Sequence, residues 1–392
     1  MEFQARRRGR FLAPRRTTRT AVTALLFAFG SVALAGCLPA AAGTHRTRGS
    51  ASAKLRRSAV KPPALFGVGL GLVTWDDTDA STENFYTGTT TPGRIIKVEI
   101  LYPSLAVKAP NLRTLATPAL RFGPYPVVVF AHGYDVDPGT YRALLVSWAE
   151  AGFVVVAPFF PDTSRPAVAA QHGVDTEGDI FNQPADVAFV VSQVVKAADR
   201  SPSTRIGYLD GMMNPARIIL AGQSDGGASV AALMYDHAYA AVRASMAAKP
   251  VAVALLSADE FLRAVDSYSA PSGGGPPVLV VQSLTDACND PANSALLYNM
   301  LKGSTKWFLA IDNATHLGPY AGLGAAASVV EQATVAFFDL AIAKPKASPS
   351  VLHQKGERPG LSTITSAASV PLFPAPAPSP GACALPSGAP TN

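Results

Sequence analysis

Short apolar runs alternate with stretches of helical pattern between residues 65 and 343. The runs 127–130 and 154–156 are continuous and rich in β-branched residues, which is typical of strands covered on both faces. Residues 95–101 alternate apolar and polar side chains and indicate a half-exposed strand. Later apolar runs predict four more strands, at 218–220, 251–255, 278–281 and 307–311.

Helical patterns separate these strands, at about 138–151, 184–200, 225–240 and 325–342. Strands that alternate with helices favour a mostly parallel sheet covered by helices on both faces. We therefore expect residues 65–343 to form one domain of the α/β class.

The segment after this domain has a different composition. Residues 344–392 include the run Pro-Ala-Pro-Ala-Pro-Ser-Pro at 374–380 and lack a helical or strand period. Such composition is typical of polyproline-like or disordered chain. The prediction for 344–392 is a disordered, Pro-rich tail.

The N-terminal segment has the pattern of an export signal. Seven arginines lie within residues 1–20, and residues 21–35 carry no charge. Fifteen helical residues span about 22 Å, short of the ~30 Å hydrocarbon core, so a cleaved signal fits better than a permanent membrane helix. Two Arg-Arg pairs, at 7–8 and 15–16, leave the Sec and twin-arginine routes both open.

Residues 34–37, Leu-Ala-Gly-Cys, resemble a bacterial lipobox at the end of the apolar run. This resemblance implies a signal peptide over 1–36 and acylation of Cys37, which would anchor an extracytoplasmic lipoprotein in the cell membrane. Residues 37–64 are rich in Ala, Arg, Ser and Thr and are expected to be a basic, flexible tether. The alternative is an ordinary secretory signal and a secreted protein.

Charge is distributed unevenly along the chain, whose formal net charge is +6. Residues 1–64 hold 13 Lys and Arg and one acid, whereas residues 65–343 hold 16 basic and 25 acidic residues. An acidic domain repels phosphate backbones, which argues against a nucleic-acid partner. With 48% hydrophobic and only 15% charged residues, the chain is also unlike a disordered polyelectrolyte.

Three cysteines are too few for a disulfide scaffold, and no Cys/His cluster has the spacing of a metal site. Cys288 and Cys383 are the thiols that remain once Cys37 is acylated. Outside the cytoplasm these two could form a disulfide or stay free, and both states remain open.

A Gly-x-Ser-x-Gly motif joins an apolar strand to an Ala-rich helix, at Gly222, Ser224 and Gly226. The two glycines allow strand and helix to approach closely, while the sharp turn strains the backbone of the serine. Ser224 is therefore the predicted nucleophile. A turn without chemistry is the alternative; a phosphate loop is disfavoured because no Gly-Lys-Ser/Thr follows.

A serine nucleophile needs a histidine base that is oriented by a carboxylate. Asp286 and His316 each follow a predicted strand, and α/β active sites gather at the carboxyl ends of strands. We expect these two residues to complete a triad. Asp290 is a rival for the acid and Asp312 a weaker one. The remaining histidines lack this position in the sequence: His45, His132, His172, His237 and His353.

An oxyanion hole requires two backbone N–H groups. The candidates are Asp225, directly after the nucleophile, and Tyr134, in the loop after strand 127–131. His132 is expected only to close that turn. The long connection 159–183 is expected to wall the pocket.

These motifs resemble the α/β-hydrolase superfamily over residues 95–342. Within it, residues 75–78, 100–104, 130–134 and 183–190 look like bacterial platelet-activating-factor acetylhydrolase-like and dienelactone-hydrolase-like esterases, whose outline chlorophyllases and polyester hydrolases share. The resemblance implies hydrolysis of carboxylic esters by a Ser-Asp-His triad without cofactor or metal. Dienelactone hydrolases use a cysteine nucleophile, whereas this chain has Ser224.

The leading hypothesis is thus a monomeric serine esterase, acting on a small-molecule or lipid-like ester and held to the membrane through Cys37. Two alternatives keep the same fold. One is an envelope acyltransferase that uses the same triad, and the other is a non-catalytic binding lipoprotein.

Overall fold

The computed structural model describes residues 62–105, 112–200, 206–258, 261–271, 274–377 and 383. The predicted signal peptide, Cys37 and the tether up to residue 61 lie outside these ranges, so those predictions stay untested. Within the described ranges, no helix is long and apolar enough to cross a membrane.

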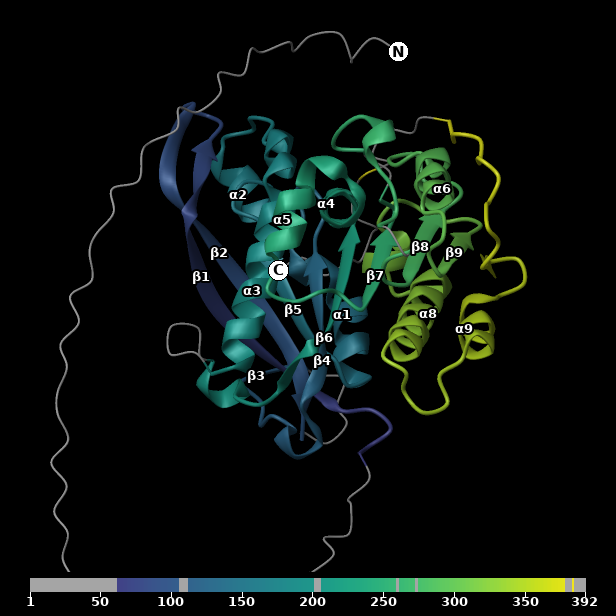
Figure 1. Ribbon diagram of the computed structural model, residues 1–392, viewed down its shortest axis with the longest axis horizontal. Helices are drawn as coiled ribbons and strands as arrows, with labels where there is room; N and C mark the ends of the chain where they lie inside the picture. The colour runs from purple at the N-terminus through teal and green to yellow at the C-terminus, as the bar shows by residue number, and fades with distance from the viewer. Residues whose placement is uncertain are drawn as a thin grey trace, which may run out of the picture. The chain divides into compact units, whose positions relative to one another are not determined.

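A sheet of ten strands forms the centre of the described chain, in the order β10-β9-β8-β7-β6-β4-β5-β2-β1-β3 (Figure 1). The block from β5 to β9 is parallel throughout. Strand β2 runs antiparallel to both β5 and β1, β10 runs antiparallel to β9, and β3 is parallel to β1. The strands are β1 (Gly67–Asn84), β2 (Thr89–Ser104), β3 (Arg113–Thr114), β4 (Tyr125–Ala131), β5 (Val154–Phe159), β6 (Met213–Gln223), β7 (Ala252–Leu256), β8 (Val278–Ser283), β9 (Lys306–Ile311) and β10 (Ser362–Thr365).

Nine α-helices accompany the sheet in the described residues: α1 (Arg142–Glu150), α2 (Arg165–Ala170), α3 (Gln183–Ala198), α4 (Asp225–Tyr235), α5 (Ala240–Ser245), α6 (Pro291–Met300), α7 (Gly318–Ala321), α8 (Ala325–Ala341) and α9 (Pro349–Gly356). Short 3₁₀ turns include η2 (Pro138–Tyr141) and η3 (Glu177–Phe181). The four helices expected from the sequence are all present, with the first divided between η2 and α1.

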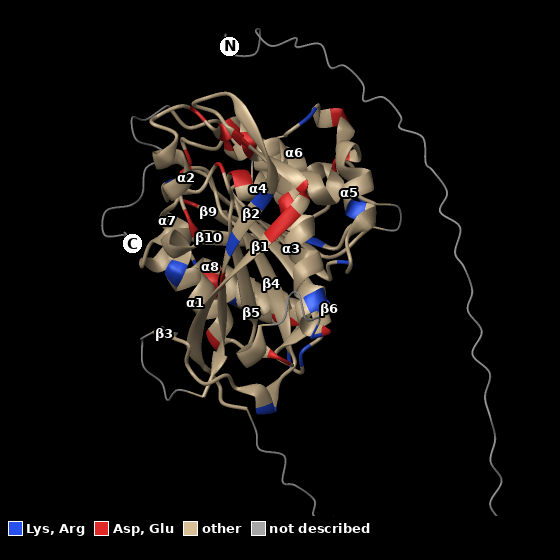
Figure 2. Ribbon diagram, turned by 90° about the vertical axis from the view of Figure 1, so that its left-hand side faces the viewer, with Lys and Arg blue, Asp and Glu red and all other residues tan. Residues whose placement is uncertain are grey.

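Both faces of the sheet are buried because its central strands are continuously apolar. In β4, Val127 and Val129 pack into one core with α3, α4 and α6, while Val128 and Phe130 pack into a second core with α1, α7 and α8. Figure 2 shows α1 and α8 on one side of the strands and α3 and α5 on the other. The predicted α/β fold with a mostly parallel, helix-covered sheet is confirmed.

The prediction of a disordered tail over 344–392 is wrong for its first part. Residues 349–356 form α9, whose first turn Ser348 caps by accepting the Val351 N–H at 3.3 Å. Residues 362–365 form β10, which extends the sheet beyond β9. Buried Leu352 and Ile364 anchor these elements in the core shared with α8. A few apolar side chains suffice here because the sheet already offers an open edge.

The chain beyond β10 continues along α6. Tyr298 Oη donates to the Ala367 carbonyl at 2.6 Å, and the Asn299 side chain exchanges two hydrogen bonds with the Val370 backbone. Phe373 stacks on Phe308 with 5.6 Å between ring centroids. The first part of the tail therefore follows α6, the helix that comes directly after Asp286 and Asp290. Of the residues after 377, only Cys383 is described.

Candidate active site

Ser224 occupies the sharp turn between β6 and α4. Its backbone has φ 54° and ψ −126°, a left-handed conformation that costs free energy for a residue with a side chain. A Cβ on Gly222 would collide with the Gly226 carbonyl, and one on Gly226 would collide with the Ala131 carbonyl. Glycine is therefore required at both positions, as the motif predicted.

His316 and Asp286 reach the same edge of the sheet from the loops after β9 and β8. His316 Nε2 lies 3.0 Å from Ser224 Oγ, and His316 Nδ1 lies 2.8 Å from Asp286 Oδ2. Ser224 is 9% exposed, His316 3% and Asp286 0%. If Nδ1–H donates to the carboxylate, Nε2 is left to accept the serine proton.

Four donors surround the Asp286 carboxylate. Oδ1 accepts the backbone N–H groups of Cys288 and Asn289, both at 3.0 Å. Oδ2 accepts the His316 ring N–H and, at 3.3 Å, the Gln282 side-chain amide. The loop after β8 thus folds around this carboxylate and aims it at His316.

The rival acids have other positions. Asp290 caps α6 by accepting the Ala292 N–H at 2.9 Å, and the Asp312 backbone N–H donates to the Leu361 carbonyl at 2.8 Å. Neither residue lines the pocket that holds Ser224. His172 packs against Tyr86, His237 contacts Ser269, and His353 lies in α9, while His45 is outside the described residues.

The two candidate oxyanion donors flank the nucleophile. Asp225 is the first residue of α4, where backbone N–H groups and the helix dipole favour negative charge. Tyr134 lines the pocket directly after Gly133, where a Cβ would lie 3.0 Å from Ser224 Cβ. The Tyr134 hydroxyl accepts the Thr176 N–H at 3.3 Å, which links this loop to the segment 159–183.

The ring of His132 stabilises the same loop through two hydrogen bonds. Its Nδ1–H donates to the Gly133 carbonyl at 2.7 Å, and its Nε2 accepts the Phe160 N–H at 3.0 Å. Burial lowers the pKa of His132 to about 4, so the ring is neutral near pH 7. These contacts fit the turn-closing role expected from the sequence.

The pocket above Ser224 has a volume of about 230 Å³. It is lined by Gly133, Tyr134, Val136, Glu177, Gln223, Ser224, Asp225, Cys288, Asn289, His316, Leu317 and Cys383. Glu177 comes from the connection that was expected to form a wall. Pockets for drug-sized ligands typically measure about 300–1,000 Å³, so this space suits a small group.

Cys288 and Cys383 are joined by a disulfide between residues 95 positions apart in the sequence. Of the two states that the sequence left open, the structure has the disulfide. Both sulfur-bearing residues line the pocket, so the far part of the tail contributes to its wall.

A buried ion cluster, which the sequence did not indicate, lies among residues that do not line the pocket. Arg94 of β2 contacts Asp162 at 3.3 Å and Asp186 at 2.7 Å, and also pairs with Asp179. Burial raises the pKa of Asp186 to about 7 and that of Asp162 to about 6, although Arg94 opposes both shifts. The sequence shows the three carboxylates within residues 162–186, but no sequence pattern connects them with an arginine some 70–90 residues earlier.

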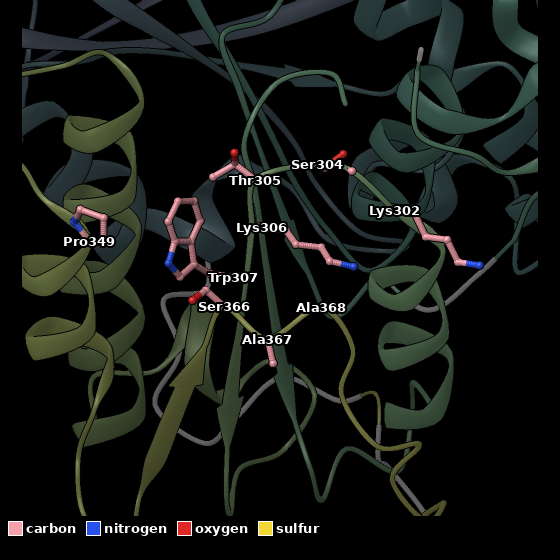
Figure 3. A pocket seen from close by; sticks show the side chains of 10 residues that line it. Lys302, Ser304, Thr305, Lys306, Trp307, Pro349, Ser366, Ala367 and Ala368 are labelled. Carbon is pink, nitrogen blue, oxygen red and sulfur yellow. The ribbon is translucent and has the colours of Figure 1, made fainter. Parts of the chain in front are cut away.

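A second cavity, of about 420 Å³, lies at the other end of β9 (Figure 3). Lys306 and Trp307 leave the strand on opposite sides, as neighbouring strand residues do. Lys306 Nζ already donates to the Tyr298 carbonyl at 2.6 Å and lies over the Tyr298 ring. The Lys306 ammonium is therefore held by Tyr298 at this cavity.

Two comparisons connect the chain with known proteins. A family model described as "Chlorophyllase" matches residues 80–258, a range that includes the Ser224 turn but ends before Asp286 and His316. A solved ferulic acid esterase from Streptomyces cinnamoneus is similar in fold, with a TM-score of 0.52 and 18% identity. The similarity covers 77% of this chain and 96% of that chain. No curated protein sequence matches.

The structural neighbour bears on the fold, and the family match bears on the chemistry. Taken with the mixed sheet and the Gly-x-Ser-x-Gly turn, they support an α/β-hydrolase-like fold and carboxylic ester hydrolase activity.

Proposed function

We propose that the chain cleaves carboxylic esters through an acyl-enzyme formed on Ser224, with His316 as the base and Asp286 as the orienting acid. The observation that carries this proposal is the hydrogen-bond series Ser224–His316–Asp286, with contacts of 3.0 and 2.8 Å at the floor of a pocket. Such a series makes a weakly acidic hydroxyl into a nucleophile.

In acylation, Ser224 Oγ attacks the ester carbonyl carbon while its proton moves to His316 Nε2. The tetrahedral intermediate collapses when the bond to the alcohol oxygen breaks, and His316 passes the proton to that oxygen. A water molecule then repeats the sequence on the acyl-serine, which releases the acid and restores Ser224. Asp286 holds the imidazole through Nδ1.

Negative charge that develops on the carbonyl oxygen requires donors already in place. The backbone N–H groups of Asp225 and Tyr134 are proposed for this role, because one opens α4 and the other follows the glycine packed against Ser224. With a pocket of about 230 Å³, a short acyl group is the expected fit. The alcohol part of the ester would then extend toward the opening.

The test is turnover of p-nitrophenyl acetate and butyrate by Ser224→Ala. Loss of all but background activity is expected, together with loss of labelling by a fluorophosphonate. Ser328→Ala is the matched control, since Ser328 lies exposed on α8 and is not among the residues that line the pocket. Full activity in Ser224→Ala would overturn the proposal. Product analysis with an added alcohol distinguishes hydrolysis from acyl transfer.

A further inference from the structure

Gln223, the residue before the proposed nucleophile, is fully buried and contacts the proposed base. Its Nε2 lies 3.1 Å from His316 Nε2, and its Oε1 accepts a hydrogen bond from Tyr141 Oη at 2.6 Å. The Gly133 N–H donates to the same Tyr141 oxygen at 3.2 Å. A continuous chain of hydrogen bonds thus runs from Gly133, beside the oxyanion loop, to the imidazole.

The direction of this chain is determined by its first member. A backbone N–H can only donate, so the Tyr141 oxygen accepts from Gly133 and turns its own proton toward Gln223. Burial raises the pKa of Tyr141 far above neutral pH, so the phenol keeps that proton. The amide of Gln223 therefore presents oxygen to Tyr141 and N–H to His316. This orientation follows from the network, which is how side-chain amides are assigned.

The contact favours one protonation state of His316. Neutral imidazole has a lone pair on Nε2, which can accept from both Gln223 and Ser224. In the imidazolium form Nε2 carries a proton, and the Gln223 N–H then faces another N–H. An amide donor at this position opposes protonation of the base in the resting enzyme.

We infer that Gln223 is a positioning residue of the reaction. Held by Tyr141 and Gly133, it keeps His316 neutral in the free enzyme and so extends activity toward lower pH. The inference rests on the proposed function, because it assigns Gln223 an effect only through His316. It also couples the loop that carries Tyr134 to the base.

The charged groups around His316 favour its protonated form, which the Gln223 donor opposes. Asp286 bonds its Nδ1, and Asp225 and Glu177 line the same pocket. All three are acidic and favour imidazolium. Tyr320, buried near Asp286, has a pKa raised far above neutral by burial and so stays uncharged. These groups are shared by every variant below, so a difference between variants reports on the Gln223 contact.

The test is the pH profile of kcat/KM for p-nitrophenyl butyrate. Gln223→Met keeps the side-chain length without a donor, and its acid limb should shift to higher pH by about one unit, the size expected from one lost hydrogen bond. Gln223→Glu should shift the limb further, because a carboxylate attracts imidazolium. Activity on the alkaline plateau, where His316 is neutral in both proteins, should change only a few-fold in Gln223→Met.

Tyr141→Phe provides an independent measurement with Gln223 intact. Without the phenol proton, the amide can turn its oxygen toward His316, so the acid limb should shift in the same direction. The double variant Gln223→Met/Tyr141→Phe should shift no further than Gln223→Met, because both changes break one chain. Fluorophosphonate labelling of each variant shows that Ser224 still reacts, which separates this test from failure of the proposed function.

Two results would overturn the inference. One is an acid limb that stays in place in Gln223→Met and Gln223→Glu while activity falls equally at every pH, which is the behaviour of a packing residue. The other is a shift to lower pH, which would mean that Gln223 presents its oxygen to His316. If Gln223→Met does not fold, the isosteric Gln223→Glu and Tyr141→Phe still decide between these outcomes.

Discussion

The backbone N–H of Cys288 donates to Asp286 Oδ1 across 3.0 Å. Cys288 is at the same time one end of the disulfide to Cys383, and both cysteines line the pocket. The covalent link therefore ends two residues from the proposed catalytic acid. The tail is attached to the loop that orients Asp286.

Breaking the Cys288–Cys383 disulfide should destabilise the loop that carries Asp286 and widen the pocket. For Cys383→Ser, or wild type treated with dithiothreitol, we expect the free energy of unfolding to fall by about 2–4 kcal/mol, typical of a disulfide that closes a long loop. The hexanoate-to-acetate ratio of kcat/KM should rise, because one wall of the pocket is released. A chain that ends after Cys383 is the control and should behave as wild type. Unchanged Tm and acyl preference would show that the disulfide has neither role.

Asp286→Asn should lower kcat by about 10⁴-fold, the loss typical when a triad acid is neutralised. The amide can no longer hold His316 in the tautomer that accepts the serine proton. Asp290→Asn is the matched control: asparagine also caps helices, so α6 and kcat should change little. Steady-state kinetics on p-nitrophenyl butyrate measure both, and reversed effects would assign the acid to Asp290.

Glu177 should make the pocket discriminate against anionic acyl groups. Glu177 lies in the pocket wall and none of the described lining residues is Lys or Arg, so a negative acyl group would approach the Glu177 carboxylate. We expect kcat/KM for p-nitrophenyl hemisuccinate to lie well below that for the butyrate at low salt. Glu177→Gln should raise the hemisuccinate value by about fivefold, the effect of roughly 1 kcal/mol of repulsion, and leave the butyrate value unchanged. Equal effects on both esters would exclude a charge effect.

The ion cluster around Arg94 should make stability fall as pH rises. Asp162 and Asp186 have raised pKa values, about 6 and 7, so between about pH 4 and 7 the folded state binds protons that the unfolded state has released. Stability is then highest in the lower part of this window and decreases toward pH 7. Asp162→Asn removes one of three carboxylates that share one arginine and can still accept from Arg94.

We therefore expect Asp162→Asn to raise Tm at pH 8 by about 2–4 °C relative to wild type, with a smaller or absent gain at pH 5. Thermal unfolding at the two pH values measures this. Arg94→Met should destabilise the protein by about 3–5 kcal/mol at pH 8, because it leaves buried carboxylates without a partner. An equal change of Tm at both pH values in Asp162→Asn would show that the carboxyl does not titrate in this window.

The lipobox-like residues 34–37 lead to a prediction about location. Acylation of Cys37 supplies at least two hydrocarbon chains, which is enough for stable membrane attachment. Wild-type protein expressed in a bacterium should therefore fractionate with membranes and dissolve in detergent. Cys37→Ser should accumulate as an unprocessed precursor or as soluble secreted protein. A mature wild-type protein that is free in the medium and begins elsewhere would leave only the secretory signal.

Much of the candidate site could be predicted from the sequence alone. The strand, the Gly-x-Ser-x-Gly turn and the Ala-rich helix lie next to each other in the chain, so local pattern identifies Ser224. Asp286 and His316 each follow a parallel strand, and parallel strands end at one edge of the sheet. They were therefore expected near Ser224 from their positions at strand ends.

Other features depended on tertiary structure. Asp290 remained a rival to Asp286 in the sequence because both lie in one loop, and only the fold of that loop turns Asp286 toward His316 and Asp290 toward the start of α6. Similarly, nothing in the sequence distinguishes Gln223 from other strand residues. Only the structure shows that its amide contacts both Tyr141 and His316.

The ordered part of the tail and the Arg94 ion cluster likewise could not be predicted from local sequence pattern. Residues 349–373 have little pattern of their own and become ordered against the edge at β9 and the surface of α6. Arg94 reaches its carboxylates across about 70–90 residues of intervening chain. Local pattern determines which residues can form an element or a motif, because those interactions join near neighbours. The orientation of a side chain toward a distant partner depends on packing of the whole chain, since the contacts that select it exist only after folding.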